Sequence, residues 1–249
     1  MMEDKSNLPE LPKSWVWTRL GELCKTTSGG TPNRKRQDYF GGNIPWLKSG
    51  ELNYNIIRSV EEFITEQGLK NSSAKIIPKG TLLIALYGAT VGKLGILGID
   101  AAINQAICAI FTPTYLDKKY LYWYLSTYRN KLLNARKGGA QPNISQQIVK
   151  NIILPFPPIC EQHRIVTKIE ELFTKLDTGV ATLKKVKVQL KRYRQAVLKY
   201  AFEGKLSEKW RRANKDNIEP ADVLLERIKA ERKKNAKRKY RQLELPPQK

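Results

Sequence analysis

Hydrophobic residues recur every seven positions through the second half of the chain. Ile169, Leu176, Leu183, Leu190 and Val197 form one series, and a companion series follows it with a gap at Gly179. This heptad pattern predicts one long helix over 161–203, ended by Gly204, and a helix that long must pack its apolar stripe against another helix. The predicted dimerisation residues are Ile169, Leu172, Leu176, Leu183, Val186, Leu190, Tyr193 and Val197.

Apolar segments in the first half are shorter and of mixed type. An apolar run bounded by glycines predicts a buried strand, and helically spaced apolar residues behind Thr114 and Asp117 predict a capped helix that ends before Gly138. Asn104 and Gln105 interrupt one of the expected strands. We expect strands over 80–88, 101–111 and 152–154 and a helix over 115–136. The fold class is therefore α+β, with a globular mixed α/β domain followed by a long helix and a short helical tail.

A proline-rich segment, 154–158, separates the two kinds of pattern, and neither a helix nor a central strand continues through it. Beyond it the chain loses most of its glycines and prolines and favours helix. Pro220 is expected to open a second helix that gives way to the basic run 232–241. We therefore predict a globular domain over 1–158, a long helix over 159–204 and a basic helical tail over 205–249.

Composition points to an anionic partner. The chain has 45 Lys and Arg against 23 Asp and Glu, a net charge of +22, which makes nucleic acid the leading candidate. No apolar run is long enough to span a membrane, and the polar N-terminus does not resemble a signal peptide. Three widely spaced cysteines fit a reducing compartment, so we expect a cytoplasmic protein. A single histidine and no CxxC pair leave no metal site to predict.

Candidate catalytic motifs fail on their spacing. The glycine-rich segment 87–95 has three residues between Gly88 and Gly92 where a P-loop needs four, and Leu94 replaces the Mg²⁺-binding hydroxyl. The segment 156–159 lacks the amide and the aromatic ring that would hold a flipped base. The Asp and Glu residues are scattered along the sequence and do not form the cluster that a Mg²⁺-dependent nuclease centre needs. We therefore expect no catalytic residue and no cofactor of the chain's own.

Polar loops on a basic domain are the remaining candidates. The segment 26–36 joins cations to small residues, and the segment 138–147 supplies amides that can read base edges. Each residue alone is consistent with a solvated surface position, and the basic run 232–241 with a solvated tail. Together, loops that offer both cations and amides favour DNA binding. The predicted DNA-binding residues are Arg34, Lys35, Arg36, Lys48, Lys70, Lys75, Tyr87, Lys93, Gln141 and Asn143.

Several ordered stretches carry a family resemblance. They are LPKSWVWTRLGEL (11–23), TSGGTP (27–32), GGNIPWLKSGEL (41–52), LLIALYGATVGKLG (82–95), INQAICAI (103–110), GAQPNISQQIVKNIILPFPPICEQHRIV (139–166), YRQAVLKYAFEGKL (193–206) and ADVLLERIKAER (221–232). With these stretches the chain resembles the specificity subunit of type I restriction–modification systems. The resemblance implies a target recognition domain that reads one half of a gapped DNA sequence, and a spacer helix that docks modification (methyltransferase) subunits. S-adenosylmethionine, ATP and Mg²⁺ would then belong to partner subunits, including a separate motor subunit for restriction.

One departure from that family matters. Its full-length members hold two recognition domains and two spacer helices, whereas this chain offers one of each. We therefore expect a half-length form that homodimerises through an antiparallel coiled coil and reads a palindromic gapped site. One arm of a split gene is the alternative. A freestanding coiled-coil DNA-binding regulator and an enzyme that acts alone are rival functions.

Overall fold

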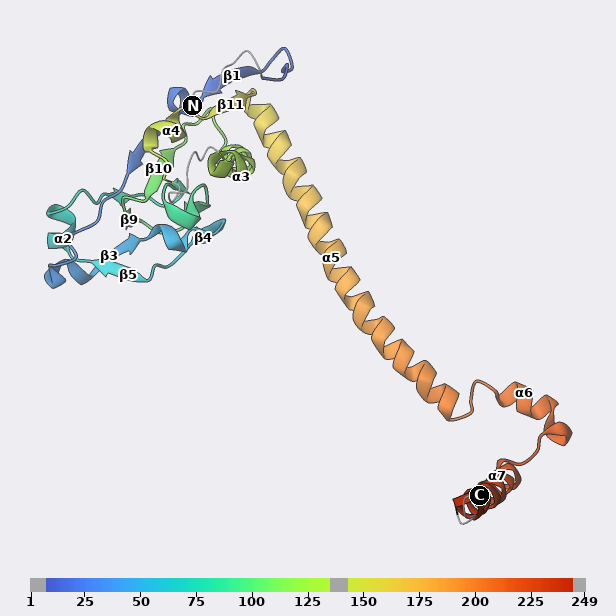
Figure 1. The fold of residues 1–249 in the computed structure, drawn as a ribbon. Helices are drawn as coiled ribbons and strands as arrows, with labels where there is room; N and C mark the ends of the chain where they lie inside the picture. Colours follow the sequence, from blue (N-terminus) through green and yellow to red (C-terminus); the bar gives the residue numbers. More distant parts are fainter. Residues whose placement is uncertain (1–7, 135–142, 244–249) are drawn as a thin grey trace, which may run out of the picture. The chain divides into compact units, whose positions relative to one another are not determined.

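The computed structural model of the chain describes residues 8–134 and 143–243 (Figure 1). Two compact units divide at Lys175 and Leu176. Among the described residues, the strands all lie in the first unit, and the second unit is helical. The α+β class predicted from the sequence is confirmed, whereas the predicted domain boundaries stay a prediction.

The described strands of the first unit form three sheets. Most strand pairs are antiparallel, but strand 40–47 pairs with strand 101–103, and strand 55–57 with strand 94–97, in parallel. In spatial order, the five-stranded sheet holds β2 (Lys25–Ser28), β10 (Ile107–Phe111), β7 (Leu82–Ala85), β8 (Leu94–Leu97) and β4 (Asn55–Ile57). The four-stranded sheet holds β5 (Glu62–Ile64), β3 (Phe40–Leu47), β9 (Ala101–Ile103) and β6 (Ile76–Ile77). The two-stranded sheet pairs β1 (Val16–Arg19) with β11 (Ile153–Phe156).

Helices of very different lengths connect and follow these strands. The α-helices are α1 (Leu20–Leu23), α2 (Glu66–Lys70), α3 (Lys118–Asn134), α4 (Gln146–Lys150), α5 (Ile159–Phe202), α6 (Glu208–Ala213) and α7 (Ala221–Leu243). Single 3₁₀ turns are η2 (Gln37–Tyr39), η3 (Ser49–Glu51), η4 (Gly88–Thr90) and η5 (Lys215–Asn217). The predicted long helix is confirmed as α5. Gly204 ends it with φ +72°, and the Lys205 amide donates back to the Tyr200 carbonyl. None of the described helices combines the length and the apolarity that a membrane crossing needs.

The central strand β7 explains the apolar run in the sequence, because both of its faces are buried. Leu82 and Ile84 join a core beneath α3, whereas Leu83 and Ala85 join a second core shared with the four-stranded sheet. A strand covered on both faces has no polar alternation to display. The predicted buried strand is therefore confirmed.

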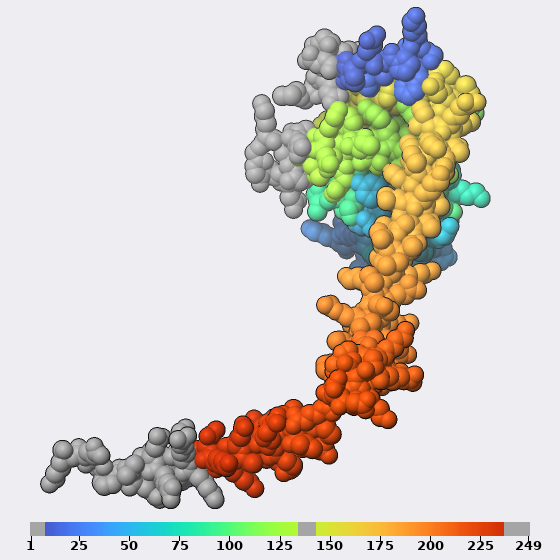
Figure 2. All heavy atoms as spheres, turned by 90° about the vertical axis from the view of Figure 1, so that its right-hand side faces the viewer, coloured from blue at the N-terminus to red at the C-terminus, as the bar shows by residue number. Residues whose placement is uncertain are grey.

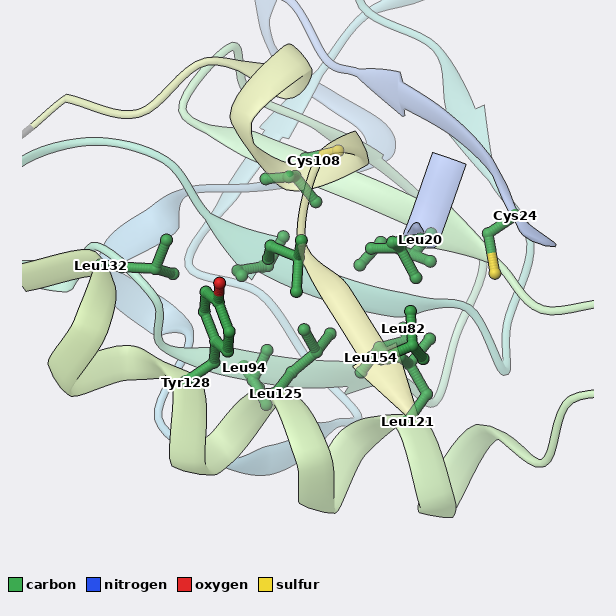
Figure 3. Packing of buried hydrophobic residues seen from close by; sticks show 14 of the residues in the cluster. Leu20, Cys24, Leu82, Leu94, Cys108, Leu121, Leu125, Tyr128, Leu132 and Leu154 are labelled. Atoms are coloured by element: carbon green, nitrogen blue, oxygen red, sulfur yellow. The ribbon is translucent and has the colours of Figure 1, made fainter. Parts of the chain in front are cut away.

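Helix α3 covers the five-stranded sheet with one apolar stripe (Figure 3). Leu121, Leu125, Tyr128 and Leu132 lie three or four residues apart and point at the sheet, which is the spacing of one helix face. The buried Cys24 and Cys108 thiols belong to the same core. Burial raises the pKa of both thiols to about 12. They therefore stay protonated and act as apolar filling.

Three of the predicted elements differ in extent. The expected strand 101–111 is two strands, β9 and β10, because Asn104 turns the chain: its carboxamide oxygen accepts from the Ala106 amide at 3.1 Å. Helix α3 begins at Lys118 and not at Tyr115, because the Asp117 carboxylate accepts from the Lys119 and Tyr120 amides and so caps it. Helix α7 does not give way at the basic run but continues to Leu243.

Candidate nucleic-acid interface

Five segments that are distant in the sequence are connected by hydrogen bonds and close contacts in the first unit. The Gly30 amide donates to the Ile103 carbonyl, the Leu86 amide to the Ala106 carbonyl, and the Ile144 amide to the Leu86 carbonyl. Tyr87 and Asn143 form an isolated antiparallel bridge. We call the segments 26–31, 72–75, 86–88, 104–106 and 143–146 the loop surface.

Two glycines allow these segments to approach so closely. A Cβ on Gly29 would lie 1.9 Å from the Ile103 carbonyl oxygen, and one on Gly30 would lie 2.3 Å from the Ser73 carbonyl carbon. Both contacts are with backbone, which cannot swing aside as a side chain can. The glycines of the segment 26–36 are therefore packing requirements of the loop surface.

Hydroxyl and amide groups on the loop surface are held in fixed orientations. The Gln146 carboxamide donates to the Thr26 carbonyl at 2.8 Å and to the Thr26 hydroxyl at 2.7 Å. The Lys75 ammonium donates to the Thr27 hydroxyl at 3.4 Å, and the Thr31 hydroxyl contacts the Gln105 carboxamide. Strand β2 and the turn between β9 and β10 thus present hydrogen-bond donors and acceptors next to the ammonium group of Lys75.

A second cationic group lies on the four-stranded sheet and is bound internally. The Arg34 guanidinium forms a two-pronged pair with Glu62, its Nη2 atom lying 3.0 Å from Oε2, and it stacks 4.9 Å from the centre of the Trp46 ring. Lys48 pairs with Glu61 at 3.1 Å and with Glu62 at 3.5 Å. The hydrogen bond from Arg34 lowers the pKa of Glu62, and attraction by both cations adds to this effect. The carboxylate is thus kept ionised.

The predicted DNA-binding cations fall into two classes. Arg34, Arg36, Lys48 and Lys70 each pair with a carboxylate, Arg36 with both oxygens of Asp38 and Lys70 with Glu66. Over residues 8–134 and 143–243, in contrast, no carboxylate pairs with three of the cations. These are Lys35, Lys75 and Lys93.

The structure brings together only some of the predicted residues. Lys75, Tyr87 and Asn143 share the loop surface. Lys93 contacts Asn53, which precedes β4, the edge strand opposite to β2 in the five-stranded sheet. Gln141 lies outside the described residues. The loop surface also holds four residues that the sequence did not single out as DNA-binding: Thr26, Thr27, Gln105 and Gln146. The one sequence signal for any of them by itself is that Gln105 interrupts an apolar run.

The predicted dimerisation residues form an uncovered stripe on α5. Ile169 and Val197 are partly buried, whereas the six positions between them are exposed, including Leu183 with 69% of its surface accessible. An amphipathic helix gains most of its stability by packing its apolar face against another part of a protein, and less from the intrinsic helix propensity of its residues. The stripe is apolar surface available to another helix.

Among the described residues, no group of three or more His, Cys, Asp or Glu side chains could hold a metal ion. The single histidine, His163, pairs with Asp117 at 3.3 Å beside the start of α5. This contact joins the first turn of α5 to the segment that leads into α3.

Comparisons with known proteins agree with this arrangement. Residues 12–191 match the family model described as the type I restriction modification DNA specificity domain. The chain is 30% identical over 168 residues to the specificity subunit of the type I restriction enzyme EcoR124I/EcoR124II from Escherichia coli, covering 65% of this chain and 41% of the relative. It is 36% identical over 212 residues to the StySPI specificity subunit from Salmonella potsdam, covering 81% and 45%.

A solved structure shares the fold. The crystal structure of the HsdS subunit from Thermoanaerobacter tengcongensis aligns with a TM-score of 0.57 at 26% identity, covering 79% of this chain and 46% of that one. The chain thus spans less than half the length of each of these relatives. The predicted resemblance to the specificity component of these systems is confirmed at the level of the family. The chain belongs to the type I restriction–modification DNA specificity domain family.

Proposed function

We propose that this chain selects the DNA site at which a type I restriction–modification complex acts, by reading one half of a gapped target with its first unit. The observation that carries the proposal is the loop surface, on a chain of net charge +22. It holds immobilised hydroxyls and amides beside Lys75, with which no carboxylate pairs in the described part of the chain. Duplex recognition needs both kinds of group, since cations position the protein on phosphates and amides read base edges.

Each class of residue has its own role in this proposal. Lys35, Lys75 and Lys93 neutralise phosphates directly. Four further cations remain proposed phosphate contacts: Arg34, Arg36, Lys48 and Lys70. Each of them must give up its ion pair with a carboxylate before it binds a phosphate, so each contributes less to the free energy of DNA binding. Tyr87, Gln141 and Asn143, with Gln105 and Gln146, are the proposed readers of the bases.

The stripe on α5 supports a homodimer. Two copies that pack their α5 helices antiparallel would cover the exposed stripe and place identical recognition domains at opposite ends. Identical domains related by a twofold axis read identical half-sites, so the proposed target is a gapped palindrome. The helices would also dock modification subunits, which bind S-adenosylmethionine and methylate the target. ATP and Mg²⁺ would serve a separate motor subunit.

Salt dependence of duplex binding tests the recognition proposal. For each phosphate contact removed, the slope of log K against log salt should fall by about 0.9. We expect this for Lys75→Gln, measured by fluorescence anisotropy with a labelled duplex of random sequence. The matched control is Lys168→Gln, because Lys168 pairs with Glu171 on α5, and it should keep the wild-type slope. A wild-type chain that ignores duplex DNA, even with its modification subunit supplied, would refute the proposal.

Co-purification separates the rival functions. A chain that captures a modification subunit from its own cells acts as a specificity component. A chain that binds a defined DNA sequence but captures no such subunit acts as a freestanding regulator. Turnover of DNA by the pure chain with Mg²⁺ and S-adenosylmethionine would establish an enzyme instead. Light scattering of the pure chain tests the dimer, since a stable monomer would require a different second half.

A further inference from the structure

One carboxamide is completely buried where α5 begins. Gln162 has 0% of its surface accessible, and over the described residues it is the only buried carboxamide. Its Nε2 atom donates to the Pro157 carbonyl at 2.8 Å and to the Tyr115 carbonyl at 3.2 Å, and its Oε1 atom accepts from the Asp117 amide at 2.8 Å. One side chain thereby joins the hinge before α5 to the segment that leads into α3.

The residues beside Gln162 strengthen the same joint. Asp117 caps α3 with one carboxylate oxygen and meets the His163 ring with the other, at 3.3 Å. On the other flank, the Trp15 indole donates to Glu161 at 2.9 Å. Consecutive residues of the first turn of α5 are therefore tied to three different parts of the first unit.

Further along α5 the contacts with α3 change in kind; Figure 2 shows the green surface of α3 next to the yellow first turns of α5. Val166 is buried against α3, Lys119 pairs with Glu170 at 2.8 Å, and the rings of Trp123 and Phe173 meet edge to face at 5.1 Å. Apolar and exposed ionic contacts of this kind attract without fixing a direction strongly. Hydrogen bonds are directional, so the three bonds of Gln162 define one rotation and one depth for the helix.

Because α5 is long, a small change in its direction at this joint produces a large displacement further along the helix. From Ile159 to Leu183 the helix rises about 36 Å at 1.5 Å per residue. A 10° change of direction at the joint would displace Leu183 by about 6 Å, which is about two base pairs at 3.4 Å each. If the direction of α5 varied at this joint, the complex would therefore accept half-sites separated by several different gap lengths.

We propose that Gln162 is a positioning residue, which fixes the direction in which α5 leaves the recognition domain and so the spacing between the two half-sites that the complex accepts. This inference rests on the proposed function, because it requires two recognition domains connected by α5. It adds a residue that touches no DNA and nevertheless sets a property of the target. Gln162 acts through the backbone of Asp117, Tyr115 and Pro157.

The test measures tolerance to gap length. The target is first selected from a randomised duplex library with the wild-type chain, and affinities are then measured for duplexes whose gap is one or two base pairs shorter or longer. Gln162→Met keeps the side-chain length but cannot make the three hydrogen bonds. We expect the wild-type chain to bind duplexes with its own gap more tightly, on the order of tenfold per base pair of change in gap length, which corresponds to about 1.4 kcal/mol. In Gln162→Met this preference should fall to within about threefold, with unchanged affinity for a single half-site.

A second variant keeps the proposal falsifiable if Gln162→Met does not fold. Lys119→Ala with Phe173→Ala removes, at two exposed positions, the ion pair with Glu170 and the ring contact with Trp123, and leaves Val166 and Gln162 intact, so it should keep the wild-type gap preference. Loss of the preference in this variant, or its retention in a folded Gln162→Met, would overturn the proposal. Failure of the wild-type chain to bind even one half-site would instead count against the proposed function.

Discussion

Truncation of Leu183 at the centre of the α5 stripe is expected to weaken self-association. Leu183 is 69% exposed in the single chain. Full burial of a leucine contributes about 1.5–3 kcal/mol, so covering that fraction contributes about 1–2 kcal/mol in each copy. A symmetric dimer loses this twice, about 2–4 kcal/mol, which corresponds to a roughly 30- to 1000-fold higher dissociation constant for Leu183→Ala. Sedimentation equilibrium over a range of concentrations measures that constant.

Two valines of α5 supply a matched control. Val186 belongs to the heptad stripe, whereas Val188, which is 52% exposed, lies two residues further on and faces away from it. Val186→Ala should weaken the dimer and Val188→Ala should not, although both remove the same atoms from one helix. Equal effects of the two changes, or an unchanged dissociation constant in Leu183→Ala, would refute the reasoning that the stripe is the interface.

Three further results are expected. Gly30→Ala should destabilise the first unit by about 1–3 kcal/mol in urea denaturation, because its Cβ meets backbone, whereas Gly50→Ala, whose Cβ meets nothing within 4 Å, should have little effect. The pKa of Glu62 is lowered in the folded chain by its hydrogen bond with Arg34, so this pair stabilises the fold above the ordinary carboxyl pKa and stops doing so as the pH falls through the folded value. In Glu62→Gln the free energy of unfolding should therefore decrease less steeply as the pH is lowered below the ordinary carboxyl pKa, and an unchanged pH dependence would contradict that role. Iodoacetamide at pH 8 should label one thiol in the native chain, that of the exposed Cys160, and mass spectrometry would count the labels.

Local patterns were enough to predict the elements with strong periodicity. The heptads predicted α5 because a seven-residue apolar repeat is a property of one continuous helix, and the apolar run around β7 predicted a strand because both faces are covered. The boundaries were less certain because they depend on single side chains. Asp117 took the cap that Thr114 was expected to share, and one carboxamide, that of Asn104, divided an expected strand into two.

The candidate interface was harder to predict, because ion pairing is decided across the fold. Nothing in the sequence distinguishes Arg34 from Lys35, its neighbour, yet Arg34 folds back on Glu62 while Lys35 pairs with no carboxylate in the described part of the chain. Gln146 meets Thr26 across 120 residues, a separation that no local pattern records.

The sequence by itself determined the fold class, the long helix with its apolar stripe, the excess of positive charge and the family resemblance, since each of these depends on residues that are near one another or on simple sums. Only the tertiary structure decided, among the described residues, which cations pair with a carboxylate, which loops share one surface and which polar side chain is buried at the start of α5. The physical reason is distance along the chain: Gln162 takes its role from a backbone amide 45 residues away, and hydrogen bonds of that kind exist only once the sheets and α3 have formed.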